Sequence, residues 1–132
     1  MSSASDEIWN RAVDLDEPIS LPGDLAVRRV LTFHAAVQGS GFWNAIEAHS
    51  ADEEFPLDAV AEGYRTLGLE PTAEAVDRAA AEYDETAGIG DDDAWREAEE
   101  RVTEEYRIED EDIAAAVERT LAQEPELFAP TD

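Results

Sequence analysis

The two histidines, His34 and His49, are the side chains best able to do acid–base or metal chemistry near neutral pH. His34 falls on the apolar face of a predicted helix, a position that is typical of a hydrogen-bonded core residue. His49 ends a short predicted helix, where a cation stabilises the helix dipole. Zinc would need further nitrogen or sulfur ligands, and the chain contains no cysteine. The sequence therefore predicts no metal site and no bound cofactor.

Other catalytic patterns are also missing. Glu47 precedes His49 by two positions rather than three, so it does not form the Glu-x-x-His pair of di-iron carboxylate bundles. Ser40 lies between Gly39 and Gly41, but nothing in the sequence supplies the oriented acid and oxyanion hole that a serine nucleophile needs. The chain also lacks a glycine-rich phosphate loop and a Gly-x-Ser-x-Gly elbow. We predict no catalytic residues and expect that the protein is not an enzyme.

A nearly uncharged stretch, residues 38–44, is the most conspicuous remaining feature. Its glycines allow a helix to break at residues 39–41, and two large aromatics, Phe42 and Trp43, then begin the next helix. One interpretation is a tight helix–helix corner pinned by both rings in the core. Another is that one ring stays exposed as an anchor for a partner protein. The candidate interaction or pocket residues are His34, Gln38, Ser40, Phe42, Trp43, Asn44 and His49.

Helices would position these side chains. No run of four or more β-branched or aromatic residues alternates with polar ones, whereas apolar residues recur at helical spacing along the chain. The sequence predicts an all-α fold of six to seven helices in a single compact domain, residues 1–132. Its core would span about residues 5–124, followed by a short disordered C-terminal tail. The expected helices lie at about 5–15, 24–38, 42–49, 56–67, 71–84, 91–106 and 110–124. The expected N-caps are Ser5, Asp24, the aspartates of residues 91–93, and either Asp110 or Asp112.

The charge of the chain is extreme. Its 34 acidic residues face nine basic ones, all of them arginine, and the formal net charge is -25. Repulsion between carboxylates is screened over about 8 Å at ordinary ionic strength but over only about 3 Å at 1 M salt. We interpret the composition as halophilic adaptation to a salt-rich cytoplasm. The alternative is mimicry of a nucleic acid, with carboxylates in the place of phosphates.

The same composition bears on partners and location. Lysine is absent and arginines are scattered singly apart from Arg28–Arg29, so nothing resembles a phosphate-binding stripe and direct nucleic-acid binding is not expected. The first residues show no signal-peptide pattern, and no stretch approaches the roughly 18 apolar residues of a membrane span. We expect a cytoplasmic protein that does not bind membranes.

Part of the chain resembles a known family. Gly39-Ser40-Gly41-Phe42 takes the place of an Asn-Gly-Gly-Phe-type turn, Leu67-Gly68 the place of a Leu-Gly stop, and residues 71–84 the place of an alanine-rich helix. Over about residues 24–84 the sequence is thus similar to a family of small helical bacterial and archaeal domains of mostly unknown function, which includes a DNA-mimic protein. The resemblance implies an all-helical fold, no named enzyme activity, and an acidic surface offered to a nucleic-acid-binding protein.

Two functional hypotheses follow from the sequence. The first is a non-enzymatic protein–protein interaction module whose partner is another protein, with a nucleic-acid-binding protein and a DNA-mimic mode of binding as its narrower form. The second is a small enzyme or ligand-binding domain with a pocket at the corner formed by residues 39–44. The oligomeric state is left open by the sequence.

The halophilic interpretation predicts that the fold depends on salt. Dialysis from multimolar to low salt removes the screening between carboxylates, so we expect a sharp loss of helix content. Circular dichroism at 222 nm measures this directly. A helix signal that is unchanged at low salt would contradict the interpretation.

Overall fold

The computed structural model describes residues 4–130, which form α-helices joined by short loops. The order of elements is α1 (Ala4–Val13), α2 (Pro22–Ser40), α3 (Phe42–Ser50), α4 (Leu57–Thr66), α5 (Glu70–Ile89), α6 (Asp92–Thr103), α7 (Asp110–Gln123) and a 3-10 turn (Pro125–Leu127). Within the described residues there is no β-strand, which confirms the prediction of an all-α fold. No helix of this part of the chain combines the length and the apolar character that crossing a membrane requires.

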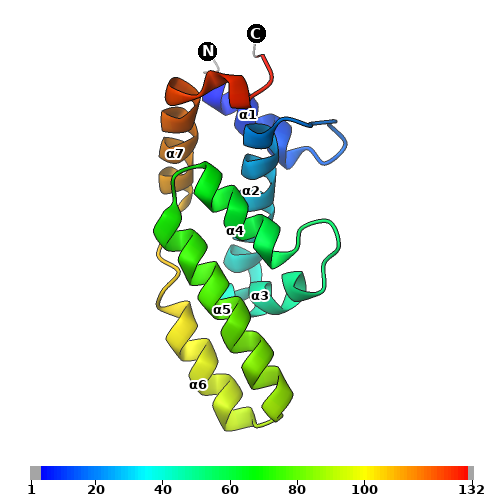
Figure 1. The fold of residues 1–132 in the computed structure, drawn as a ribbon, viewed down its shortest axis with the longest axis vertical. Coiled ribbons are helices and arrows are strands. Elements are labelled where there is room, and N and C mark those ends of the chain that lie inside the picture. The colour runs from blue at the N-terminus through cyan, green and yellow to red at the C-terminus, as the bar shows by residue number, and fades with distance from the viewer. Residues whose placement is uncertain (1–3, 131–132) are drawn as a thin grey trace.

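Helix α2 is the centre of the structure. It packs against α1, α3 and α4, and α4 crosses it in Figure 1. Val27, Val30, Leu31, Phe33 and His34 are all buried along its middle turns. Because these residues cover more than one face of the helix, α2 can be surrounded by neighbours on several sides. Helices α5 and α6 form a hairpin at one end of the elongated molecule, and α1 and α7 lie at the other end (Figure 1).

The crossing of α2 and α4 depends on Gly63. A Cβ atom at this position would lie 3.1 Å from the carbonyl oxygen of Ala26 and 3.3 Å from a methyl carbon of Val30. The missing side chain therefore lets the two helix backbones approach closely. Val60, Ala61 and Tyr64 complete the buried face of α4.

Several helix boundaries differ from the sequence prediction. Helix α2 runs through Gly39 and Ser40, so the break before α3 is made by Gly41 alone, whose φ of 93° suits glycine. Helix α5 continues past the predicted residue 84 to Ile89 and ends at Gly90 with a φ of 72°. Tyr106 lies beyond the end of α6.

The predicted caps had mixed outcomes. The N-cap of α6 is Asp91, one of the three aspartates predicted to supply it, and its carboxylate accepts hydrogen bonds from the backbone N–H groups of Asp93 and Ala94. Ser5, predicted to cap the first helix, lies inside α1. The prediction for α7 was wrong, because Glu109 is the N-cap and Asp112 completes a capping box with it. Asp24 is not a cap either: it lies inside the first turn of α2 and is 2 % exposed.

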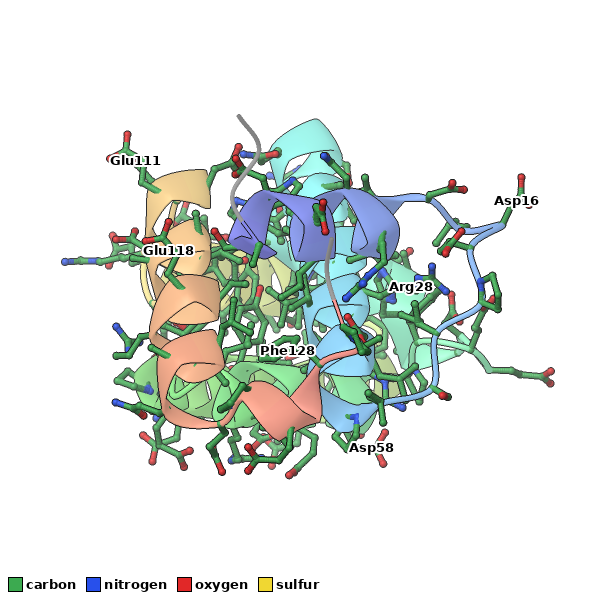
Figure 2. All side chains as sticks on the ribbon, turned by 90° about the horizontal axis from the view of Figure 1, so that it is seen from above. Asp16, Arg28, Asp58, Glu111, Glu118 and Phe128 are labelled. Carbon is green, nitrogen blue, oxygen red and sulfur yellow. The ribbon has the colours of Figure 1, made fainter. Side chains whose placement is uncertain are left out.

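Two arginines hold the α1 end of the molecule together. The guanidinium of Arg28, labelled in Figure 2, donates hydrogen bonds of 2.6–3.0 Å to the carbonyl oxygens of Arg11, Ala12, Asp14 and Glu17. These contacts satisfy carbonyls at the C-terminal end of α1 and fix the loop that follows it. Arg11 in turn forms an ion pair of 2.9 Å with the buried carboxylate of Asp24.

The chain beyond residue 124 differs from the predicted disordered tail. Phe128 is 4 % exposed and lies between α7 and α2 (Figure 2). The backbone N–H of Ala129 donates to Asp24 at 2.8 Å, and Arg11 donates to the carbonyl oxygens of Ala129 and Pro130. This segment therefore packs against the N-terminal turn of α2, where it donates a hydrogen bond to a buried carboxylate whose charge Arg11 balances. Residues 131–132 of the predicted tail lie outside the described residues.

The docking of this segment predicts the effect of substituting Gly23. A Cβ atom there would lie 2.7 Å from the carbonyl oxygen of Leu127 and 2.8 Å from the ring of Phe128. We expect Gly23→Ala to lower the free energy of unfolding by about 1–3 kcal/mol, the usual cost of overpacking. Denaturant unfolding monitored by circular dichroism measures the change.

Gly39→Ala is the matched control. Gly39 is also in α2, but no atom lies within 4 Å of its ideal Cβ position. Alanine there should be neutral or stabilising, by up to about 1 kcal/mol. Equal effects of the two substitutions would show that the contact with residues 127–128 does not matter.

Candidate functional site

The rings of the α2–α3 corner are buried. Phe42 is 2 % exposed and Trp43 is 1 % exposed. Phe42 stacks on Tyr106 with ring centroids 4.8 Å apart, and Trp43 makes an edge contact with Trp95 at 5.1 Å. The structure thus matches the interpretation of a corner pinned in the core, and neither ring is presented as an exposed anchor.

The polar candidates near this corner make local contacts. Ser40 donates to the carbonyl oxygen of Ala36, and Asn44 donates to that of Ser40. Both residues are exposed. His49 is buried and its Nδ1 lies 2.8 Å from the carbonyl oxygen of Phe55, so it ties α3 to the segment before α4. The structure therefore gives no common pocket to Ser40, Asn44 and His49.

His34 belongs to a different cluster, a hydrogen-bonded chain of three side chains that we call the tyrosine relay: His34, the partly buried Tyr106, and Tyr64. The Nδ1 atom of His34 lies 2.7 Å from the hydroxyl of Tyr106, and that hydroxyl lies 2.6 Å from the hydroxyl of Tyr64. The relay joins α2, α4 and the segment after α6. Burial raises the pKa of both tyrosines, and that of Tyr64 well above its usual value. Both hydroxyls therefore stay protonated where an exposed tyrosine would ionise.

The other ring nitrogen of His34 faces the first turn of α7. Its Nε2 lies 2.9 Å from Oδ1 of Asp110, but the carboxylate is out of line for a hydrogen bond from the ring, and Nε2 has no hydrogen-bond partner among the described residues. The same carboxylate oxygen accepts a hydrogen bond of 3.0 Å from Gln38. We therefore regard the His34–Asp110 contact as a close electrostatic approach that helps to hold α7 against α2.

Two surface hollows border the candidate residues. His34 and Gln38 line one of about 460 Å³, together with Val37, Tyr106 and residues 108–111. Phe42 and Trp43 line another of about 380 Å³, together with Gly41, Glu99, Glu100, Thr103 and Glu104. The seven candidate residues therefore do not converge on one site. Acidic side chains border both hollows, and no arginine lines either one.

Acidic side chains are densest between residues 91 and 112. This stretch holds 12 of the 34 acidic residues and only three arginines. Among the described residues, only one of the 12, Glu105, forms an ion pair with an arginine: it lies 2.9 Å from Arg78. We call the surface formed by α6 and the first turn of α7 the acidic face. No group of three His, Asp or Glu side chains with metal-binding geometry is found within residues 4–130.

Sequence reasoning missed the tyrosine relay. Each member falls on the apolar side of its own segment, where a polar-tipped side chain is easily taken for a hydrophobic one. Tyr106 is 72 residues from His34 and 42 from Tyr64, so only the tertiary fold brings the three together. The signal that was available is that a buried tyrosine usually finds a hydrogen-bond partner.

The relay predicts the effect of removing its central hydroxyl. Tyr106→Phe keeps the ring that stacks on Phe42 but leaves His34 and Tyr64 with unpaired polar groups. We expect a loss of about 1–3 kcal/mol in the free energy of unfolding, measured by denaturant titration. Tyr83→Phe is the control, since no hydrogen bond of the Tyr83 hydroxyl is found within the described residues. If the two substitutions cost the same, the relay does not stabilise the fold.

Comparison with known proteins gives one match. A family model described as DMP19-like protein matches residues 21–127. This range covers α2 to the 3-10 turn and includes the corner, the tyrosine relay and the acidic face, but not α1. Searches of curated proteins and of solved structures found no significant match. Because the model matches most of the chain, the protein belongs to the DMP19-like protein family.

Proposed function

We propose that the protein is a non-enzymatic interaction module that binds another protein through its acidic face. The observation that carries this proposal is the density of carboxylates between residues 91 and 112, only one of which pairs with an arginine. A surface of this kind repels nucleic acids and acidic proteins and attracts a basic one. Nucleic-acid-binding proteins present such basic surfaces to the phosphate backbone. The partner class that fits best is therefore a nucleic-acid-binding protein, bound in a DNA-mimic mode.

The wider distribution of charge has a separate explanation. Asp16, Asp58 and Glu111 lie on different sides of the molecule (Figure 2), so acidic side chains are not confined to the acidic face. A general spread of this kind favours solvation in a salt-rich cytoplasm. The acidic face is a local excess on that background.

High salt limits what charge alone can do. At about 1 M salt the Debye length is about 3 Å, so attraction between surfaces acts only in direct contact. Binding then needs shape and apolar contact as well. Ile89, which is 66 % exposed at the tip of the α5–α6 hairpin, lies next to the start of α6 and supplies an apolar contact at the edge of the acidic face.

The pocket alternative has weaker support. It required polar groups to converge at the corner, but the hollow there is lined by buried aromatic rings and glutamates. The hydrogen bonds of Ser40, Asn44 and His49 are to backbone carbonyls. No feature of the hollow beside His34 points to a reaction. We therefore favour the interaction module.

Affinity capture tests the proposal. The tagged full-length chain should retrieve a nucleic-acid-binding protein from a lysate of the source cells at native salt, and added double-stranded DNA should displace it. A variant with Glu97→Gln, Glu100→Gln and Glu104→Gln, which we call the α6 triple variant, removes two charges on α6 and one at its C-cap. We expect this variant to reduce the recovered partner at least tenfold.

The matched control removes the same charge elsewhere. Glu53→Gln, Glu54→Gln and Asp58→Asn alter exposed residues around the start of α4 and should leave recovery unchanged. Recovery of no partner, or equal loss with both triple variants, would contradict binding through the acidic face. A partner that DNA does not displace would contradict the DNA-mimic mode.

A further inference from the structure

A third hollow lies between α1 and α7, at the opposite end of the molecule from the α5–α6 hairpin (Figure 1). Its volume is about 450 Å³. Its lining combines apolar, polar and acidic residues, and it comprises Ser5, Asp6, Trp9, Asn10, Asp110, Glu111, Ala114, Val117 and Glu118. It is thus distinct from the α2–α3 corner, and it meets the acidic face at the first turn of α7.

The apolar side of this hollow is built around Trp9. Trp9 is partly buried and packs against the hydrophobic core, and it is also one of the residues that line the hollow. Ala114 and the fully buried Val117 extend the apolar wall along α7. An aromatic face beside aliphatic carbons offers a flat surface on which a planar or aliphatic group can stack.

The negative charge of the hollow favours a positively charged ligand. Asp6, Asp110, Glu111 and Glu118 contribute carboxylates, and no basic residue lines it. The N-terminus of α7 would by itself attract an anion, but its first turn already carries three acidic residues and its cap is Glu109. A cation over an indole face and among carboxylates is stabilised by both.

We propose that this hollow binds an arginine side chain of the partner protein, with its guanidinium stacked on Trp9 and hydrogen-bonded to Glu111 and Glu118. The proposal rests on the proposed function, because it takes the partner to be a basic protein. Glu118 already accepts a long hydrogen bond of 3.4 Å from Ser5, but a carboxylate has about four acceptor positions and can accept several donors at once.

Two observations favour arginine over lysine. The guanidinium is planar, is less strongly hydrated than an ammonium, and can stack on an aromatic ring while it donates to a carboxylate. An arginine side chain would then contact both the tryptophan and the carboxylates of the hollow. Its stacking on the ring would persist at salt concentrations that screen its attraction to the carboxylates. In addition, all nine cationic side chains of this chain are arginines, and a partner with the same compositional bias would present arginine.

The hollow also lies partly outside the family match. Trp9 and the other α1 residues precede residue 21, where the match begins. The hollow therefore combines α1 residues outside the matched range with α7 residues inside it. This lets the site be tested separately from the acidic face.

Nuclear magnetic resonance provides a site-specific test. The chain has three tryptophans, so three indole N–H signals are expected from the labelled full-length protein, and Trp9→Phe identifies one of them. Titration with a capped Gly-Arg-Gly peptide should shift the Trp9 signal and leave those of Trp43 and Trp95 in place. The same peptide with citrulline, which is neutral but similar in shape, should bind at least threefold more weakly.

Charge variants complete the test. Glu111→Gln with Glu118→Gln changes only exposed side chains and should raise the dissociation constant of the arginine peptide at least threefold. Glu53→Gln with Glu54→Gln carries the same change in charge far from the hollow and should have no effect. An unmoved Trp9 signal, or equal shifts with the arginine and citrulline peptides, would overturn the proposal.

Partner capture separates this inference from the proposed function. If Trp9→Phe reduces recovery of the partner, the arginine site belongs to the interface. If the α6 triple variant loses the partner while Trp9→Phe retains it, the acidic face binds and the arginine site is wrong. A third outcome is that free argininamide shifts the Trp9 indole signal as strongly as the peptide does, while Trp9→Phe leaves the recovery of the partner unchanged. The hollow would then be a site for small organic cations, and the assignment of a partner arginine to it would be wrong.

Discussion

The fold has to hold a chain together in which carboxylates outnumber cationic side chains almost four to one. Its arginines are placed accordingly, at the junctions between elements. Arg65 pairs with Asp77 and so joins α4 to α5, Arg101 pairs with Glu82 and joins α6 to α5, and Arg78 reaches Glu105 beyond the end of α6. Together with the contacts of Arg11 and Arg28 at the α1 end, these pairs put positive charge where two acidic segments approach one another. Hydrophobic burial drives the packing, and the arginines limit the repulsion that opposes it.

The sequence predicted the helices well because their apolar residues recur at helical spacing, and that pattern is a local property. It also predicted that the aspartates of residues 91–93 supply the cap of α6, because aspartate is a favoured N-cap residue and these three directly follow a glycine. Asp24 shows where such reasoning stops: it stands at a typical capping position, yet the fold uses its carboxylate to bind Arg11 and the backbone of Ala129. Val13 fits an inward-facing pattern but is 55 % exposed, because α1 is short and only its Ile8–Ala12 face meets the core.

The candidate site was harder to predict than the fold for a related reason. Phe42 and Trp43 were singled out by their size and their position after a glycine, and the structure uses both to fill the corner. The tyrosine relay and the hollow beside Trp9 are made of residues from distant segments, and neither has a motif. Membership of the DMP19-like protein family places the chain among small helical proteins but does not by itself specify a function. The charge distribution and the hollows then supply the specific hypotheses about how such a protein recognises another.

The contact between Asp24 and Ala129 also constrains how the molecule is made. The two residues are 105 positions apart, so the first turn of α2 is synthesised long before the segment that covers it. During translation the carboxylate of Asp24 and the cleft that later receives Phe128 stay open to water while the central helices can already pack. This end can close only after residues 128 and 129 have been synthesised. A chain that stalls or is cut before residue 128 would expose an apolar cleft beside a buried charge, which quality-control proteases and chaperones recognise by its hydrophobic surface.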